Sequence, residues 1–410
     1  MLNKMRKLRV GVWVENGIMK ETGGGHGYVN QLLKHLSTYK FESADIIFIS
    51  YEPFDQDSIF YNKSYTIKWK KFISPTLKQW QRRLNKITGS FDFHYYKTDF
   101  SEEIIANNEA LRNELKEIID LIYYPSPGCA IPNFPFVYTL WDIGHLSTYA
   151  FPEVSMNGNF DSRKSLHDSI LMQALAIFCE SETGKKEAVK FLNINDSRIK
   201  VVPLFPSEVI KDEIDEQKPE SVEEGTKFVH YPAQFWAHKN HYNLIIAFKE
   251  VIKALPYLKL ILTGSDKGNK KYIISLVEEM ELMDSVIDLG FVSTENLKWI
   301  YENSKGLVMP TFLGPTNMPL LEAAELGCPV ACSDFEGHRE LLGDYAIFFN
   351  PKDPKEIAQS IIQMVNEGKT GKKIEYISRF NIHNALKSID ESFSDLKTFR
   401  FCWGLNDFIR

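Results

Sequence analysis

The stretch GLVMPTFLGPTNMPLLEAAELGCPVACS, residues 306–333, decides the fold. An apolar strand at Gly306–Met309 leads through a loop with Gly and Pro to a helix at Leu320–Leu326, and a second apolar strand follows at Pro329–Ser333. This order of strand, loop, helix and strand is typical of a parallel sheet with crossover helices. Such sheets bind ligands at the carboxyl ends of their strands, so the loop after Met309 is a candidate binding site.

Outward from this stretch, the same alternation covers nearly the whole chain. Residues 205–226 interrupt it with prolines, many acids and almost no large apolar residues, which is typical of a linker. We therefore expect an α/β protein with two Rossmann-like doubly wound parallel-sheet domains, residues 1–204 and 227–384, facing a central cleft, and a C-terminal helix at about 385–410 packing back on the first. Further strands are expected at Leu8–Val14, Asp45–Ser50, Leu121–Tyr124, Phe136–Leu140, Ala176–Cys179, Ile199–Val202, Lys227–Tyr231, Leu258–Thr263, Val286–Leu289 and Ala346–Phe349.

The composition narrows the class of protein. With 410 residues, of which 44% are hydrophobic, the chain can bury a core in each domain. The 48 basic and 54 acidic residues give a net charge of −6, which argues against a nucleic-acid partner. Five cysteines without a CxxC pair indicate neither a zinc ribbon nor a disulfide framework, and they fit the cytoplasm. No apolar run is long enough to span a membrane, so we expect any membrane contact to be peripheral.

Two motifs at expected strand ends are candidates for binding an anion. In Thr22–Gly27, Gly24 and Gly25 allow a ligand close to the backbone, and His26 lies at the start of a helix whose free N–H groups attract a phosphate. The alternative is a flexible turn. Lys239 immediately precedes a long helix, where a lysine can meet a bound diphosphate. The alternative there is a capped helix with a solvated lysine.

The loop and helix after Met309 form the third motif. Thr311 and the backbone amides of Thr316, Asn317 and Met318 can hydrogen-bond phosphate or sugar oxygens. Glu322, one turn into the helix, can accept two ribose hydroxyls, although it can also be a solvated helix residue.

The order of these motifs, together with GPTNMPLLEAAELGCPV and EGHRELLGD, resembles the retaining glycosyltransferases of family 4, also called glycosyl transferases group 1. The resemblance runs from the first strand to about Ile361. It implies the GT-B fold, a nucleoside-diphosphate sugar donor, and no metal or other cofactor. By the same resemblance, Glu322 binds the ribose, Lys239 binds the diphosphate, and Glu340 lies close to the donor.

The sequence departs from the family pattern at the donor site. Gly314 occupies the place of the family's first signature glutamate, and Thr316, Asn317 and Met318 replace its aromatic residue, glycine and leucine. We therefore expect loop amides, Thr316 or Asn317 to recognise the sugar hydroxyls. The family's arginine before Lys239 is also absent, so we expect Thr311, the loop amides or the Gly-rich loop to supply the missing hydrogen-bond donor.

In the first half, Tyr138–His145 resembles the family's strand-end HD motif, with Trp141 in place of its histidine. His145 is our candidate to contact the acceptor or the 6-position of the donor sugar, with Asp142 and His26 on the acceptor side. The alternatives are a loop histidine without a role and an aspartate that caps a turn.

The segment Lys63–Lys86 is rich in basic residues and has no acid. Read as a helix, it has an apolar stripe flanked by basic side chains, which is typical of a segment that docks on anionic lipid. The alternative is a core-packed helix with a solvated basic face. The candidate membrane residues are Lys78, Trp80, Arg82, Arg83 and Lys86.

These motifs predict a metal-independent retaining enzyme that moves a hexosyl group, with mannose favoured, from a GDP- or UDP-linked sugar. The expected acceptor is a glycan or a lipid-linked glycan in cell-surface polysaccharide synthesis, such as that of lipopolysaccharide. Lys239, His145 and Glu322 are the expected catalytic residues. We expect a cytoplasmic protein, either free or peripheral on the inner face of the plasma membrane. Two alternatives stay open: a non-catalytic GT-B binding or assembly protein, and a nucleotide-sugar epimerase on the same fold.

Overall fold

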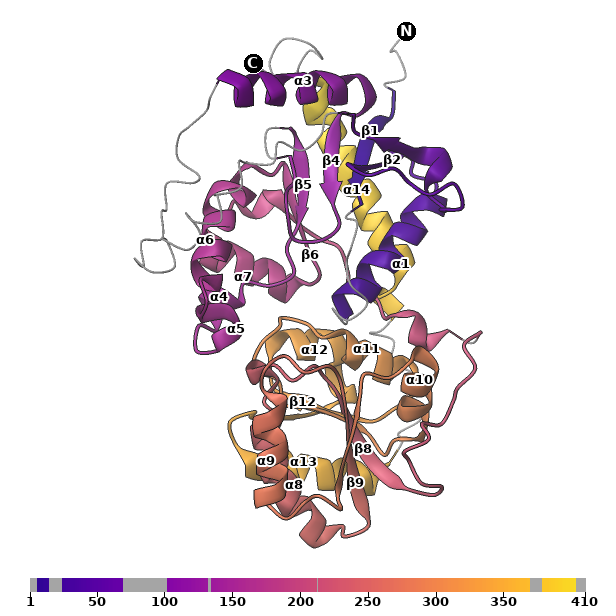
Figure 1. Cartoon of the computed structure of the whole chain (residues 1–410), viewed down its shortest axis with the longest axis vertical. Coiled ribbons are helices and arrows are strands. Elements are labelled where there is room, and N and C mark those ends of the chain that lie inside the picture. The colour runs from indigo at the N-terminus through magenta and orange to yellow at the C-terminus, as the bar shows by residue number, and fades with distance from the viewer. Residues whose placement is uncertain are drawn as a thin grey trace, which may run out of the picture.

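The computed structural model describes residues 6–14, 24–68, 102–131, 134–211, 213–368 and 378–402. They form two α/β domains that lie one above the other along the long axis of the molecule (Figure 1). Each domain is built on a parallel sheet with helices packed on it. This confirms the predicted fold class.

The N-terminal sheet has seven strands in the order β3-β2-β1-β4-β5-β6-β7, and its paired strands are all parallel. Its strands are β1 Leu8–Trp13, β2 Ala44–Ser50, β3 Ser64–Thr66, β4 Leu121–Tyr124, β5 Phe136–Thr139, β6 Ala176–Cys179 and β7 Ile199–Val201. The strands β4, β5 and β6, none of which is an edge strand, are buried at every residue, which explains their continuous apolar runs. The helices of this domain are α1 Gly24–Thr38, α3 Glu102–Ile118, α4 Gly144–Ser147, α5 Pro152–Ser155, α6 Asn159–Ser169 and α7 Glu182–Leu192.

The C-terminal sheet has six strands in the order β10-β9-β8-β11-β12-β13, again paired in parallel. Its strands are β8 Lys227–Pro232, β9 Leu258–Thr263, β10 Val286–Gly290, β11 Leu307–Met309, β12 Val330–Ser333 and β13 Ile347–Phe349. Its helices are α8 His241–Ala254, α9 Lys270–Glu279, α10 Thr294–Asn303, α11 Met318–Glu325, α12 Glu336–Leu342 and α13 Pro354–Glu367.

Both sheets reverse their strand order at the centre. The first strand of each domain lies beside the fourth, so β1 pairs with β4 and β8 pairs with β11. Loops that leave such a pair diverge to opposite faces of the sheet and open a crevice at its carboxyl edge. The loops after β1, β8 and β11, which carry the three predicted motifs, therefore all start at a switch point.

The last described helix, α14 Ile382–Cys402, returns to the N-terminal domain and packs against α1, β2 and β7 (Figure 1). The Asp390 carboxylate accepts hydrogen bonds from the backbone N–H groups of Glu42 (2.7 Å) and Ser43 (3.0 Å). Near the end of the helix, the buried Arg400 donates through Nε to the Asp120 carbonyl oxygen at 3.2 Å. Polar bonds near the middle and near the end of α14 thus hold the helix in place.

Two local features were not visible in the sequence. β3 was not predicted, because Ser64–Thr66 is short and lacks an apolar run. The segment 205–226, which joins the two domains, is partly buried: Phe205, Val209 and Val222 are buried, and the Lys298 ammonium on α10 donates to the carbonyls of Lys211 and Ile214, both at 2.9 Å. Its few apolar residues are scattered, so the composition gave no sign of this packing.

Candidate active site

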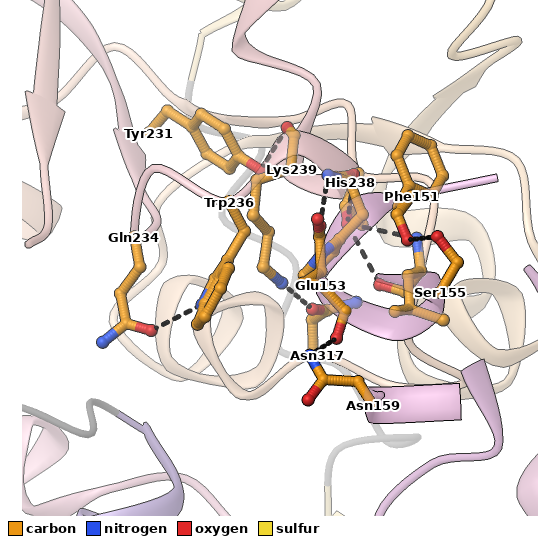
Figure 2. A network of polar contacts seen from close by, with 12 residues as sticks. Phe151, Glu153, Ser155, Asn159, Tyr231, Gln234, Trp236, His238, Lys239 and Asn317 are labelled. Atoms are coloured by element: carbon orange, nitrogen blue, oxygen red, sulfur yellow. Dashed lines mark hydrogen bonds and ion pairs between the residues drawn. The ribbon is translucent and has the colours of Figure 1, made fainter. Parts of the chain in front are cut away.

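Loops from the two domains meet at the carboxyl edges of the sheets. The Thr316 hydroxyl, after β11, donates to the Glu180 carboxylate, after β6, at 3.1 Å. The backbone N–H of His238 donates to the Glu153 carboxylate of α5 at 2.7 Å, and the His238 ring contacts the same carboxylate (Figure 2). Nearby, the rings of Phe151 and Phe312 stack with centroids 5.5 Å apart. The predicted donor loops therefore face the N-terminal domain across direct polar contacts.

Lys239 ends a short 3₁₀ turn between β8 and α8. Its ammonium donates to the Asn317 side-chain oxygen at 3.0 Å, and its carbonyl accepts from the Tyr231 hydroxyl at 2.8 Å (Figure 2). Burial lowers the pKa of Lys239 to about 8, against a smaller opposing effect of Asp142 and Glu153. Among the residues that the structure describes, no carboxylate forms an ion pair with Lys239, and such a partly buried ammonium is suited to bind an anion.

Asn317 is held in turn by a buried histidine. Its side-chain nitrogen lies 2.9 Å from His338 Nε2, and His338 Nδ1 lies 2.8 Å from the Ser333 carbonyl oxygen. Burial lowers the pKa of His338 to about 4, so the ring is neutral at pH 7. We assign the proton to Nδ1, because a carbonyl can only accept; Nε2 then accepts from Asn317. This chain fixes the Asn317 oxygen toward Lys239.

The loop between β11 and α11 is shaped by two glycines. Gly314 has a φ of +113°, which non-glycine residues rarely adopt. A Cβ atom at Gly337, in the first turn of α12, would lie 1.5 Å from the Pro315 carbonyl oxygen, so only glycine permits this contact. Thr311 is buried and donates to the Leu313 carbonyl oxygen at 3.0 Å. The backbone N–H of Met318 opens α11 next to this loop.

Glu322 lies on α11 and is buried, with 4% of its surface exposed. Its Oε2 accepts from the Tyr301 hydroxyl at 2.7 Å, and Ser207 of the inter-domain segment also hydrogen-bonds to it. Burial raises the pKa of this carboxyl. The solvated alternative is therefore wrong, and the ribose-binding role of Glu322 stays a prediction.

Glu340 is engaged across the domain interface instead of lying free beside the donor loop. Its two oxygens accept from the backbone N–H groups of Glu182 and Thr183, each at 2.9 Å, and from the Thr183 hydroxyl at 2.8 Å. Carboxylates are favoured at such helix N-termini. In this structure Glu340 thus caps α7 of the other domain, and its place close to the donor stays a prediction.

The structure buries His145 completely. Its ring lies 4.8 Å from the ring of His167, and neither ring nitrogen has a partner among the described residues. Burial lowers its pKa to about 4, so it is neutral. Asp142 accepts from the Gly144 backbone N–H at 2.7 Å and pairs with Arg163, so it does cap a turn. The catalytic role of His145 and the acceptor-side role of both residues stay predictions.

At the Gly-rich motif, α1 begins at Gly24. A Cβ at Gly25 would lie 2.8 Å from the Trp141 ring, so glycine lets the helix start rest on this indole. Trp141 is 36% exposed and occupies the position where the resemblance expects a histidine. The side chain of His26 lies outside the described residues, as do Thr22 and Gly23.

Sequence reasoning missed two carboxylates that touch the donor side, Glu153 and Glu180. Glu153 follows Pro152 in a short helix and belongs to no pattern. Glu180 directly follows β6, so the strand-end rule that selected Lys239 and Thr311 would also have selected it.

The candidate membrane residues Lys78, Trp80, Arg82, Arg83 and Lys86 lie outside the described residues. None of the helices within the described ranges is both long and apolar enough to cross a membrane. In the same ranges, no three His, Cys, Asp or Glu side chains gather as a metal-binding group.

Residues 212–379 match the family described as "Glycosyl transferases group 1". The O-antigen chain mannosyltransferase B of Escherichia coli is 27% identical over 266 residues, which are 62% of this chain and 67% of that protein. The O-antigen chain mannosyltransferase RfbU of Salmonella typhimurium is 30% identical over 213 residues, 51% of this chain and 55% of that protein. The crystal structure of Anabaena HepE in complex with UDP and glucose superposes with a TM-score of 0.63 at 15% identity, covering 95% of this chain and 100% of HepE.

The structural likeness gives the fold, and the sequence relatives give the class of enzyme. Two Rossmann-like domains with facing carboxyl edges are the GT-B architecture. The match over the C-terminal domain and the related transferases identify the chain as a glycosyltransferase.

Proposed function

We propose that the chain is a metal-independent retaining glycosyltransferase of family 4 that moves a hexosyl group, preferably mannosyl, from a GDP- or UDP-linked sugar to a glycan or lipid-linked acceptor in cell-surface polysaccharide synthesis. The observation that carries the proposal is the half-buried Lys239 ammonium, oriented by Asn317 at the switch point of the C-terminal sheet. The O-antigen mannosyltransferases among the relatives favour mannose and a polysaccharide product. The UDP complex of HepE supports a nucleotide in this fold.

The proposed chemistry depends on the leaving group. As the bond between sugar and diphosphate breaks, negative charge grows on the diphosphate, and groups already oriented toward it stabilise the transition state. Lys239 supplies the positive charge, while the Met318 backbone N–H, at the start of α11, supplies a hydrogen bond. Glu322 accepts the ribose hydroxyls, which take the place of the Tyr301 or Ser207 hydroxyl as its partners.

A thermal-shift screen of UDP-, GDP- and dTDP-sugars tests this proposal, followed by a transfer assay with the stabilising donor in the presence of EDTA. Glu322→Ala should weaken nucleotide binding and Lys239→Ala should lower turnover. Two variants with unchanged kinetics would overturn the site assignment. The anomeric configuration of the product, read by NMR, tests retention.

The same assay separates the alternatives. A binding or assembly protein would show neither transfer nor donor hydrolysis. An epimerase would convert the donor without any acceptor. Either result would replace the proposed activity.

We also propose that the basic segment holds the enzyme on the cytoplasmic face of the membrane, near a lipid-linked acceptor. Each basic residue close to an anionic surface contributes about 1 kcal/mol of attraction. Replacing Lys78, Arg82, Arg83 and Lys86 together by Gln should release the protein from phosphatidylserine vesicles in a sedimentation assay. Sedimentation that does not change on replacement would refute this membrane contact.

A further inference from the structure

A pocket lies at the carboxyl ends of β5 and β6, where the N-terminal domain faces the loop after β11. Trp141, Glu180, Gly184 and Glu187 line it from the N-terminal domain, and Pro315 closes it from the C-terminal domain. Residues of both domains therefore meet around one small volume. The catalytic groups proposed above do not account for this pocket.

Glu180 is the acid of this pocket that touches the donor loop. Its Oε1 accepts from the Thr316 hydroxyl at 3.1 Å and, less closely, from the Ser181 hydroxyl at 3.4 Å. Within the described residues, Oε2 has no hydrogen bond to another residue and the carboxyl forms no ion pair; the carboxyl is also hydrogen-bonded to the backbone N–H of Glu180 itself. A Cβ at Gly184 would lie 3.0 Å from Oε1 and 3.2 Å from Oε2, so the glycine leaves the carboxyl its space.

A desolvated carboxyl such as that of Glu180 lowers the stability of the folded protein. Burial raises the pKa of Glu180 to about 8, and the neighbouring Asp142 adds to the shift. A folded protein gains nothing from a desolvated acid without a cation, and such groups concentrate at functional sites. At pH 7 the carboxyl is mostly protonated, so it can both donate and accept a hydrogen bond, as a sugar hydroxyl requires.

The donor loop itself provides no acid. Residues 311–318 read TFLGPTNM, so any carboxyl that meets a sugar held by this loop must come from elsewhere. Thr316 already joins Glu180 to the loop, whereas Lys239 contacts the same loop through Asn317. Lys239, the proposed diphosphate ligand, and the Glu180 carboxyl thus contact neighbouring residues of one loop. The two side chains come from opposite domains.

We propose that Glu180 hydrogen-bonds a hydroxyl group of the transferred sugar, so that recognition of this sugar depends on a residue of the N-terminal domain. This inference rests on the proposed function. Thr316 orients the carboxyl through Oε1, and Oε2, which has no hydrogen bond to another described residue, takes the sugar hydroxyl. A site built around such a hydroxyl strongly rejects a donor that lacks it, because the buried carboxyl is then left without its partner.

The test compares Glu180→Met with Glu182→Met, a matched control two residues along whose side chain is exposed. GDP and UDP serve as probes without sugar, and GDP-mannose and UDP-glucose as probes with sugar. We expect Glu180→Met to keep its affinity for GDP and UDP and to be at least as thermally stable as the wild type, because it removes a desolvated acid, while kcat/KM with the accepted sugar nucleotide falls roughly 10- to 100-fold. Glu182→Met should match the wild type in all three measurements.

A deoxy donor series sharpens the result. The wild type should discriminate strongly against one deoxy form of the accepted sugar, and Glu180→Met should lose most of that discrimination, since the two changes remove the same contact. An active wild type whose Glu180→Met variant keeps full kcat/KM and full discrimination would refute the inference and leave the proposed function standing. A wild type that neither binds nor turns over any of the four probes would refute both.

Discussion

Replacing Lys239 by Met should stabilise the protein and, at the same time, weaken its hold on a diphosphate. Methionine keeps most of the aliphatic stem and removes the ammonium that burial disfavours. The pKa of Lys239 falls from 10.5 to about 8 because the charged form is desolvated. A residue that reduces stability while it supports binding is expected at a functional site.

The size of the gain follows from this shift. The pKa difference, 10.5 minus 8, corresponds to about 3.4 kcal/mol at roughly 1.36 kcal/mol per unit. Because the side chain is only partly buried, we take about half of this value. The Asn317 oxygen loses its donor in the variant, which offsets about 1 kcal/mol. The net expectation is about 1 kcal/mol, or roughly 2 to 4 °C in Tm for a domain of this size.

The pH dependence is a further signature of this mechanism. The folded pKa lies below the unfolded one, so the cost of the ammonium is complete below pH 8 and disappears as the pH rises toward 10.5. The Tm advantage of Lys239→Met should therefore be largest near pH 7 and small at pH 10. Lys271→Met, at an exposed lysine of α9, should show no such trend.

Two assays decide the matter. Calorimetry at pH 7 and pH 10 gives the Tm difference, and titration with UDP and GDP at pH 7 gives the affinity. Loss of a charged hydrogen bond should weaken the better-binding diphosphate by roughly 10- to 150-fold. A variant that loses stability equally at both pH values and binds the diphosphate as well as the wild type would refute the reasoning.

Two further predictions concern contacts around the site. Glu340→Gln leaves one oxygen for the two backbone N–H groups at the start of α7, which should lower the free energy of unfolding by about 1 kcal/mol. Hydrogen exchange at the Glu182 and Thr183 amides should therefore become faster. Unchanged exchange would contradict the cap. Gly337→Ala should lower the free energy of unfolding by about 1 to 3 kcal/mol, because its Cβ would displace the Pro315 carbonyl. The control Gly27→Ala, at a helical glycine whose Cβ would meet nothing within 4 Å, should not lower it. Equal unfolding midpoints for the two variants would contradict this prediction.

Much of the fold could be predicted because buried parallel strands form continuous apolar runs that stand out between helices. β6 and β9 begin and end at the expected residues. The pattern has no information on short polar strands such as β3, whose position depends on pairing with β2. Nor does composition reveal burial when apolar residues are few and scattered, as in 205–226.

The sequence selected residues that the structure brings together where a motif and a strand end coincide, as at Lys239, Asn317 and the loop after β11. It could not show contacts that depend on position in space. His145 follows a strand end, but the short helix α4 turns its ring into its own domain, against His167. Glu340 lies in a recognisable motif, but its partner is an N-terminus that is 157 residues away along the chain, and only the packing of the two domains shows this contact.

The contacts between the domains favour directional bonds to backbone or hydroxyl groups over ion pairs. Glu340 caps α7, Glu153 accepts from the His238 N–H, and Glu180 accepts from Thr316, whereas the ion pair of Lys186 with Glu336 is exposed. Exposed pairs are weak and tolerate many geometries, but hydrogen bonds to N–H groups constrain distance and angle. The interface therefore sets the position of Glu180 relative to Lys239. Since the proposed sugar contact and the proposed diphosphate contact come from opposite domains, only this arrangement of the domains completes the site.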